Sequence, residues 1–110
     1  MDKLLKYQQI ICEILDEYSK IQGIPAEIKS HTLFDKEAHH YQLLSMGWFR
    51  QEYTYNVAMH IDIIEEKIWI QQNNTDANIA KELIESGIAK EDIFLGYMLP
   101  SRRQFAATAA

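Results

Sequence analysis

The sequence has a single cysteine, two prolines and no long apolar run. Because Cys12 has no second cysteine in the chain, an internal disulfide and a zinc site built on cysteine pairs are both excluded. A membrane-spanning helix needs about 18 or more consecutive apolar residues, so we expect no membrane segment. Acidic and amide residues near the N-terminus interrupt the apolar stretch that a secretory signal requires, which predicts a cytoplasmic protein.

Basic residues are also few. Sixteen acidic and eleven basic side chains give a net charge of −5, and the stretch from Asp62 to Asp92 holds eight of the acids but only three lysines. Proteins that read nucleic acids normally carry a basic stripe that neutralises phosphates. The only basic doublet is Arg102–Arg103. We expect these two arginines to be solvated, with contact to an anion or to a partner carboxylate as the alternative. Direct nucleic-acid binding is therefore not expected.

Motifs that bring chemistry with them are missing as well. With four glycines in the chain, there is no glycine-rich phosphate loop, and none of the serines lies in a nucleophile elbow. We therefore expect no catalytic residue and no cofactor.

The 110 residues fit one domain, residues 1–110, of α+β class. Apolar residues recur every three or four positions from Leu4 to Ile21, which predicts a long N-terminal helix capped by Asp2 and ending near Gln22–Gly23. β-branched and aromatic residues then dominate, and they predict strands at about 27–35, 40–49, 53–64 and 67–72. The connections are too short for parallel crossovers, so these four strands form an antiparallel meander.

A short second helix and a final short strand complete the predicted fold. Thr75 or Asp76 caps that helix, Ile79, Leu83 and Ile84 face inward, and Gly87 ends it. Residues 93–97 read as the last strand, whose position in the sheet stays open. Both helices are expected to pack on the core face of the sheet.

Alternation along the third strand separates two faces. The core face is predicted to carry Tyr55, Val57, Met59, Ile61 and Ile63. The opposite face is predicted to carry Thr54, Asn56, Ala58, His60 and Asp62. In the fourth strand, Trp69 and Gln71 fall on this second face, so His60, Asp62, Trp69 and Gln71 form a candidate interaction face. An exposed sheet face with large aromatic side chains is commonly buried in an interface between copies of the chain, which predicts a homo-oligomer.

His60 and Asp62 also allow a chemical interpretation. Side chains two apart on a strand lie about 7 Å from each other, which suits two metal ligands or an oriented general base. A third ligand cannot be placed there from the sequence, and this holds for Cys12 and for the pair His39–His40. We therefore expect a hydrogen-bonded pair and no metal, with a metal-dependent or nuclease-associated enzyme as the alternative.

Several stretches resemble one known family. The most specific are His60-Ile61-Asp62, the run from Lys67 to Gln72 (KIWIQQ), Lys90-Glu91-Asp92-Ile93, and Gly96-Tyr97 before Pro100. The segment from Leu33 to Trp48, with Asp35, His40 and Gly47, fits the same pattern. Over nearly its whole length, the chain resembles the XisI family, the fdxN-element excision controlling factors of cyanobacteria.

The resemblance implies a small α+β accessory protein that supports excision of a DNA element during heterocyst differentiation. It implies an XisH-like companion protein, with the strand chemistry left to a separate recombinase. It implies no catalytic residue in this chain. The leading hypothesis is thus a non-enzymatic factor that acts by binding another protein.

Overall fold

The computed structural model describes residues 2–21 and 25–105. In chain order these residues form two helices, five strands and two short 3₁₀ turns. The elements are α1 (Lys3–Ser19), β1 (Lys29–Asp35), β2 (His40–Phe49), β3 (Glu52–Ile64), β4 (Lys67–Asn73), α2 (Ile79–Glu85), η1 (Lys90–Asp92), β5 (Ile93–Leu95) and η2 (Pro100–Arg102). The predicted α+β class and element order are confirmed.

Helix α1 begins where the sequence predicts. The side chain of Asp2 accepts a hydrogen bond of 3.2 Å from the backbone N–H of Leu4, as an N-cap does. The helix ends at Ser19, earlier than expected, where the backbone N–H groups of Lys20 and Ile21 bond to carbonyls three residues back instead of four. The predicted stop at Gln22–Gly23 lies outside the described residues.

The strands form one sheet in the order β1-β2-β3-β4-β5. The first four pair antiparallel, as predicted, and β5 pairs parallel to β4 at the sheet edge. The segment that contains α2 is long enough for this parallel return. Two hairpin turns, Arg50–Gln51 and Glu65–Glu66, have positive φ at both residues, which matches the right-handed twist of the flanking strands.

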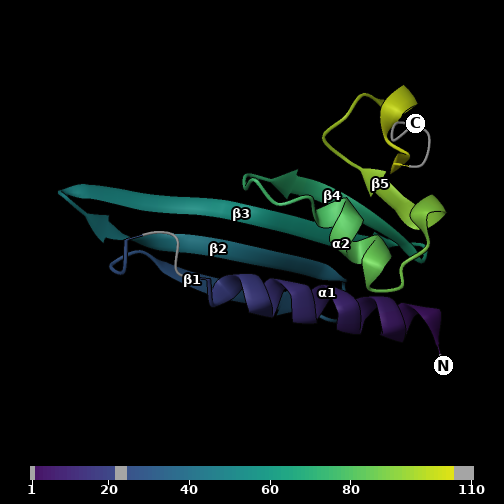
Figure 1. The fold of residues 1–110 in the computed structure, drawn as a ribbon, viewed down its shortest axis with the longest axis horizontal. Helices are drawn as coiled ribbons and strands as arrows, with labels where there is room; N and C mark the ends of the chain where they lie inside the picture. Colours follow the sequence, from purple (N-terminus) through teal and green to yellow (C-terminus); the bar gives the residue numbers. More distant parts are fainter. Residues whose placement is uncertain (1, 22–24, 106–110) are drawn as a thin grey trace.

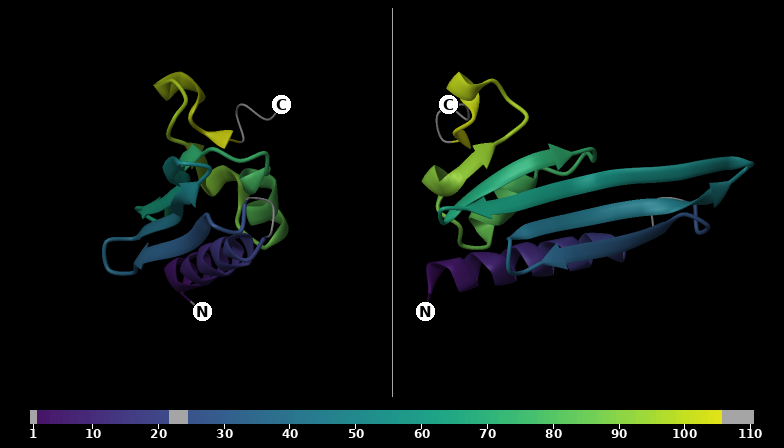
Figure 2. Two further views of the ribbon diagram at one scale, coloured as in Figure 1. Left: turned by 90° about the vertical axis from the view of Figure 1, so that its left-hand side faces the viewer. Right: turned by 180° about the vertical axis from the view of Figure 1, so that it is seen from behind.

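Both helices cover the same side of the sheet and leave the other side without a helix (Figures 1 and 2). The core lies between α1, α2 and this covered side. Its fully buried members include Ile11, Leu15, Tyr41, Ile61, Ile68, Leu83, Ile88 and Ile93. Neither helix of the described residues has the length and apolar character needed to cross a membrane.

The second helix has a different cap from the one predicted. Asn78, rather than Thr75 or Asp76, accepts a hydrogen bond of 3.2 Å from the N–H of Lys81. Thr75 is instead engaged in the preceding turn, where its N–H and hydroxyl both donate to the side chain of Asn73. Ile84 is only partly buried. The last strand is also shorter than predicted and stops at Leu95.

A β-bulge in β3 overturns part of the predicted face assignment. The β2–β3 register passes from Leu43–Met59 to Leu44–Val57, so Ala58 is an extra residue and the alternation reverses there. Tyr55, predicted in the core, is 63% exposed, whereas Ala58, predicted on the open face, is 8% exposed. Val57 shares the face of its partner Leu44 rather than that of Met59. The prediction holds for Met59, Ile61 and Ile63, which lie beyond the bulge.

Candidate functional site

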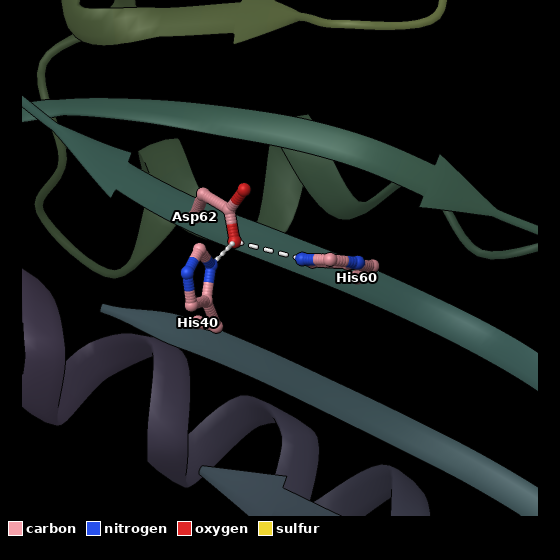
Figure 3. Close-up of side chains that lie close together, drawn as sticks. All are labelled: His40, His60 and Asp62. Carbon is pink, nitrogen blue, oxygen red and sulfur yellow. Dashed lines mark hydrogen bonds and ion pairs between the residues drawn. The ribbon is translucent and has the colours of Figure 1, made fainter. Parts of the chain in front are cut away.

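Three side chains from two strands meet on the open face of the sheet (Figure 3). Asp62 of β3 has one carboxylate oxygen, Oδ1, that lies 2.8 Å from Nδ1 of His40 and 2.7 Å from Nε2 of His60. His40 begins β2 and is the direct cross-strand neighbour of Asp62. His60 precedes Asp62 by two residues and so projects from the same face. We call these three residues the His–His–Asp cluster.

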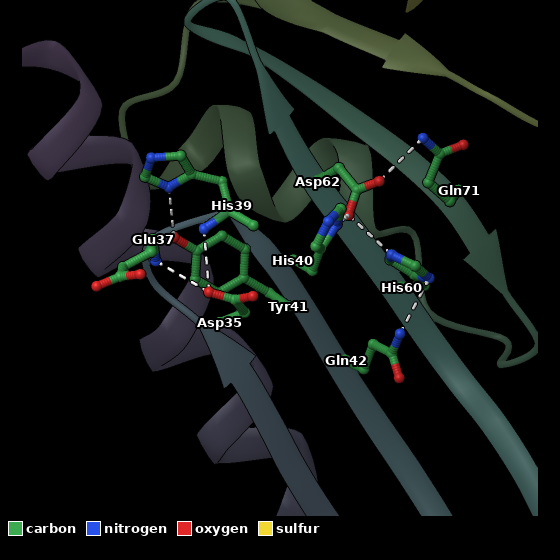
Figure 4. A network of polar contacts seen from close by, with 10 residues as sticks. Asp35, Glu37, His39, His40, Tyr41, Gln42, His60, Asp62 and Gln71 are labelled. Carbon is green, nitrogen blue, oxygen red and sulfur yellow. Dashed lines mark hydrogen bonds and ion pairs between the residues drawn. The ribbon is translucent and has the colours of Figure 1, made fainter.

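The side chains of two glutamines, Gln42 and Gln71, contact the cluster (Figure 4). Gln71 donates a 3.2 Å hydrogen bond to Oδ2 of Asp62, the oxygen that neither histidine contacts. The side-chain nitrogen of Gln42 lies 3.4 Å from Nδ1 of His60. When the amide nitrogen of Gln42 donates to Nδ1, a neutral His60 ring carries its proton on Nε2 and donates it to Asp62.

The turn before β2 fixes the position of His40. Oδ1 of Asp35 accepts hydrogen bonds of 3.1 and 3.0 Å from the N–H groups of Glu37 and Ala38. Next to it, His39 adopts a positive φ of 62°, and its Nδ1 lies 3.0 Å from the hydroxyl of Tyr41 (Figure 4). The chain therefore enters β2 with His40 on the open face and Tyr41 in the core.

Asp62 is a buried carboxylate in this cluster, only 7% exposed. Burial raises the pKa of its carboxyl, but the hydrogen bonds from His40, His60 and Gln71 outweigh burial and bring that pKa below its usual value. The hydrogen bond to Asp62 in turn raises the pKa of His40. The cluster thus favours a negative aspartate surrounded by imidazoles.

A hollow of about 520 Å³ opens beside the cluster on the same side of the molecule. Its walls come from β1, β2 and β3. They are formed by Leu33, Phe34, Asp35, His40, Gln42 and His60. Two of the three cluster residues therefore border a space that a small molecule or ion can enter.

Trp69 lies on this face as predicted, but other side chains partly cover its ring. Its ring stacks on Phe94 of β5, with 4.9 Å between ring centroids and 13° between planes. The guanidinium of Arg103 lies 6.0 Å from the ring centroid, and its Nε donates to the carbonyl of Met98. Arg103 is thus a neighbour of Trp69 rather than a solvated residue, whereas Arg102 in η2 is exposed.

Three of the exposed aromatic residues lie farther along the sheet, in the β2–β3 hairpin. β1 pairs with β2 only to Met46, and β4 pairs with β3 only to Met59. The end of the hairpin, which starts at the Met46–Tyr55 pair where β1 stops, is therefore a two-stranded ribbon that projects beyond α1 (Figures 1 and 2). We call this part the projecting ribbon. It carries Trp48, Tyr53 and Tyr55, which are 64%, 53% and 63% exposed.

His40 is the site residue that the sequence did not place. If β2 and β3 paired without a bulge from the Arg50–Gln51 turn onward, His40 would lie opposite Ile61, on the core face. The bulge at Ala58 shifts the pairing by one residue and puts His40 opposite Asp62. A weak signal was present, because the pair His39–His40 lies at the start of the strand that pairs with the His-x-Asp strand.

Comparison with known proteins gives a consistent result. A family model described as XisI protein matches residues 1–110. The chain is similar to a XisI-like protein from Anabaena variabilis, with 37% sequence identity, 93% of this chain and 94% of that chain covered, and a TM-score of 0.86. It is also similar to the fdxN element excision controlling factor XisI from Anabaena variabilis, with 30% identity, 93% of each chain covered and a TM-score of 0.78. No curated protein matches the sequence.

Proposed function

This chain belongs to the XisI family, and we propose that it is a non-enzymatic accessory factor that controls excision of a DNA element by binding an XisH-like companion protein. One solved relative is named a controlling factor of fdxN element excision. That name describes control of a reaction rather than the strand chemistry itself. The proposed setting is the cytoplasm of a cyanobacterial cell, with an fdxN-type element excised during heterocyst differentiation.

The projecting ribbon is the observation that supports binding to a protein. An isolated two-stranded hairpin is at best marginally stable in water, and large exposed aromatic side chains in one place mark interaction surfaces. Trp48 and Tyr53 pair directly across the ribbon, with ring centroids 5.2 Å apart. Aromatic residues of this kind are the side chains that contribute most to protein–protein binding.

Charge argues against DNA as the direct partner. The net charge is −5, and the ribbon offers only Arg50 as a basic side chain. A surface of this composition releases few counterions from a phosphate backbone, so it gains little from contact with DNA. In this proposal the chain therefore acts on the DNA element indirectly, by binding the companion protein.

A binding experiment with purified proteins tests this function. We expect the chain to bind the XisH-like protein encoded beside it in the native host, as measured by co-purification and by calorimetry. The double variant Trp48→Ser with Tyr55→Ser should weaken that binding at least tenfold, because it removes the aromatic contacts of the ribbon.

Tyr97→Ser is the matched control, since Tyr97 is also an exposed aromatic residue (56%) but lies outside the ribbon. This variant should bind as the wild type does. Absence of binding by the wild-type chain contradicts the proposed function. Equal loss of affinity in the ribbon variant and in the control removes the ribbon as its site.

A further inference from the structure

We propose that the His–His–Asp cluster is a binding site for a divalent transition-metal ion of the Zn²⁺ class, with His40 Nδ1, His60 Nε2 and Asp62 Oδ1 as its three protein ligands. This inference concerns the open face of the sheet and does not depend on the companion protein. The three atoms lie within 4.8 Å of one another. They come from neighbouring positions on two paired strands, so the backbone holds them together.

The spacing of the ligand atoms fits a small ion after a slight expansion. Zn²⁺ lies 2.0–2.1 Å from imidazole nitrogen and about as far from carboxylate oxygen, which separates neighbouring ligands by roughly 3.3 Å in a tetrahedral site. The two nitrogen–oxygen distances in the cluster are 2.8 and 2.7 Å. A change of about half an ångström per pair is within the reach of side-chain rotation, and the side chain of His40 has room to rotate because it is 52% exposed.

The surrounding glutamines suit this role. Gln71 occupies Oδ2 of Asp62, which leaves Oδ1 directed at the two imidazoles. A metal on Nε2 of His60 requires the proton of that ring to move to Nδ1, beside Gln42. The amide of Gln42 can turn by 180°, so that its oxygen accepts a hydrogen bond from the Nδ1–H group, and Gln42 can therefore support either tautomer. Partners of this kind orient metal-bound histidines in known sites.

The ligand types select the class of ion. Two imidazoles and one carboxylate suit Zn²⁺ and its transition-metal neighbours, whereas Mg²⁺ and Ca²⁺ prefer sites made of oxygen alone. Three protein ligands leave one tetrahedral position open, to water or to an incoming group. The hollow lined by His40, His60 and Asp35 gives access to the cluster from solvent.

The test is a metal titration of the full chain, purified without a histidine tag and treated with a chelator. We expect calorimetry to show one Zn²⁺ bound per chain, and Co²⁺ to give a visible absorption band that titrates to the same stoichiometry. His40→Asn and His60→Asn should each weaken Zn²⁺ binding at least tenfold. Gln42→Leu should weaken it by about tenfold, because outer partners of ligands typically contribute 10–100-fold.

His31→Asn is the matched control, since His31 is an exposed histidine on the same face of the sheet but outside the cluster. It should bind Zn²⁺ as the wild type does. His40→Asn is the decisive variant, because an exposed side chain at a strand end can be replaced without loss of the fold, and circular dichroism checks this. The proposal is overturned if the wild type takes up no stoichiometric Zn²⁺, or if a folded His40→Asn binds it equally well.

Discussion

The hydroxyl of Tyr7 in α1 donates a hydrogen bond of 2.6 Å to Oδ2 of Asp92, 85 residues later in the chain. The same carboxylate lies 2.8 Å from Nζ of Lys3 and 2.9 Å from Nζ of Lys67. Asp92 is 5% exposed, and burial raises the pKa of its carboxyl. The bonds from Lys3, Tyr7 and Lys67 outweigh burial and lower that pKa to about 2. One carboxylate thus joins α1, β4 and η1.

Replacing Asp92 by Asn should lower the free energy of unfolding by about 2 kcal/mol. The amide cannot accept from all three donors, and a hydrogen bond to a charged group contributes roughly 1.5–3 kcal/mol. The two lysines are about 40% exposed and can turn to water, which limits the loss. Urea unfolding measures the change. Glu91→Gln, at the exposed neighbouring position, is the control, and an equal effect there contradicts the assignment.

Low pH should remove the stability that the ionised carboxylate of Asp92 contributes. The pKa of Asp92 is about 2 in the folded chain and 3.8 in its ordinary range. A group with a lowered folded pKa stabilises the protein above its unfolded pKa, and that stability is lost as pH falls from about 5 toward 2. The loss amounts to roughly 2–3 kcal/mol, since one pKa unit is about 1.4 kcal/mol. Unfolding of Asp92→Asn, followed from pH 6 to 2, should show a correspondingly weaker dependence on pH.

Gly47→Ala should destabilise the base of the projecting ribbon. A Cβ atom at this position lies 2.4 Å from the backbone oxygen of Glu27, and φ is 152°. We expect a loss of about 2–3 kcal/mol from this contact and the backbone strain. At Gly87, φ is also positive (113°), but a Cβ meets only the flexible side chain of Lys6 at 3.4 Å. Gly87→Ala should therefore lower the stability less than Gly47→Ala, as measured by thermal unfolding. A larger loss for Gly87→Ala contradicts this account.

The isolated chain should self-associate through the projecting ribbon. In the isolated chain Trp48, Tyr53 and Tyr55 are exposed to water, and a symmetric dimer is the commonest way to cover such a surface. Light scattering at tens of micromolar should show a dimer or larger species. Trp48→Ser with Tyr55→Ser should shift it toward the monomer, whereas a wild-type chain that is monomeric at this concentration contradicts the expectation.

Duplex DNA should bind more weakly to this chain than to ordinary non-specific binders, whose dissociation constants are about 10⁻⁴–10⁻⁶ M at physiological salt. The reason is the net charge of −5 and the engagement of Arg103 with Trp69 and Met98. Gel shifts with random duplex DNA measure this. A salt-sensitive shift that Arg102→Ala with Arg103→Ala abolishes establishes direct binding instead.

The local structure could be predicted from the amino-acid sequence alone. Apolar spacing predicted both helices, and β-branched runs with short polar connections predicted four antiparallel strands, because these signals act between residues close in the chain. Alternation in strands also placed His60, Asp62, Trp69 and Gln71 on one face. The family resemblance was readable from the same residues.

Features that depend on strand register could not be predicted in this way and follow from the three-dimensional pairing of the strands. The bulge at Ala58 has no clear sequence signal, since it is a feature of the pairing between β3 and β2 rather than of either strand alone. It exposed Tyr55, buried Ala58 and placed His40 opposite Asp62. The parallel pairing of β5, which stacks Phe94 on Trp69, likewise depends on contacts between distant residues. A shift of one residue moves side chains to the opposite face, so the third member of the cluster followed from pairing rather than from composition.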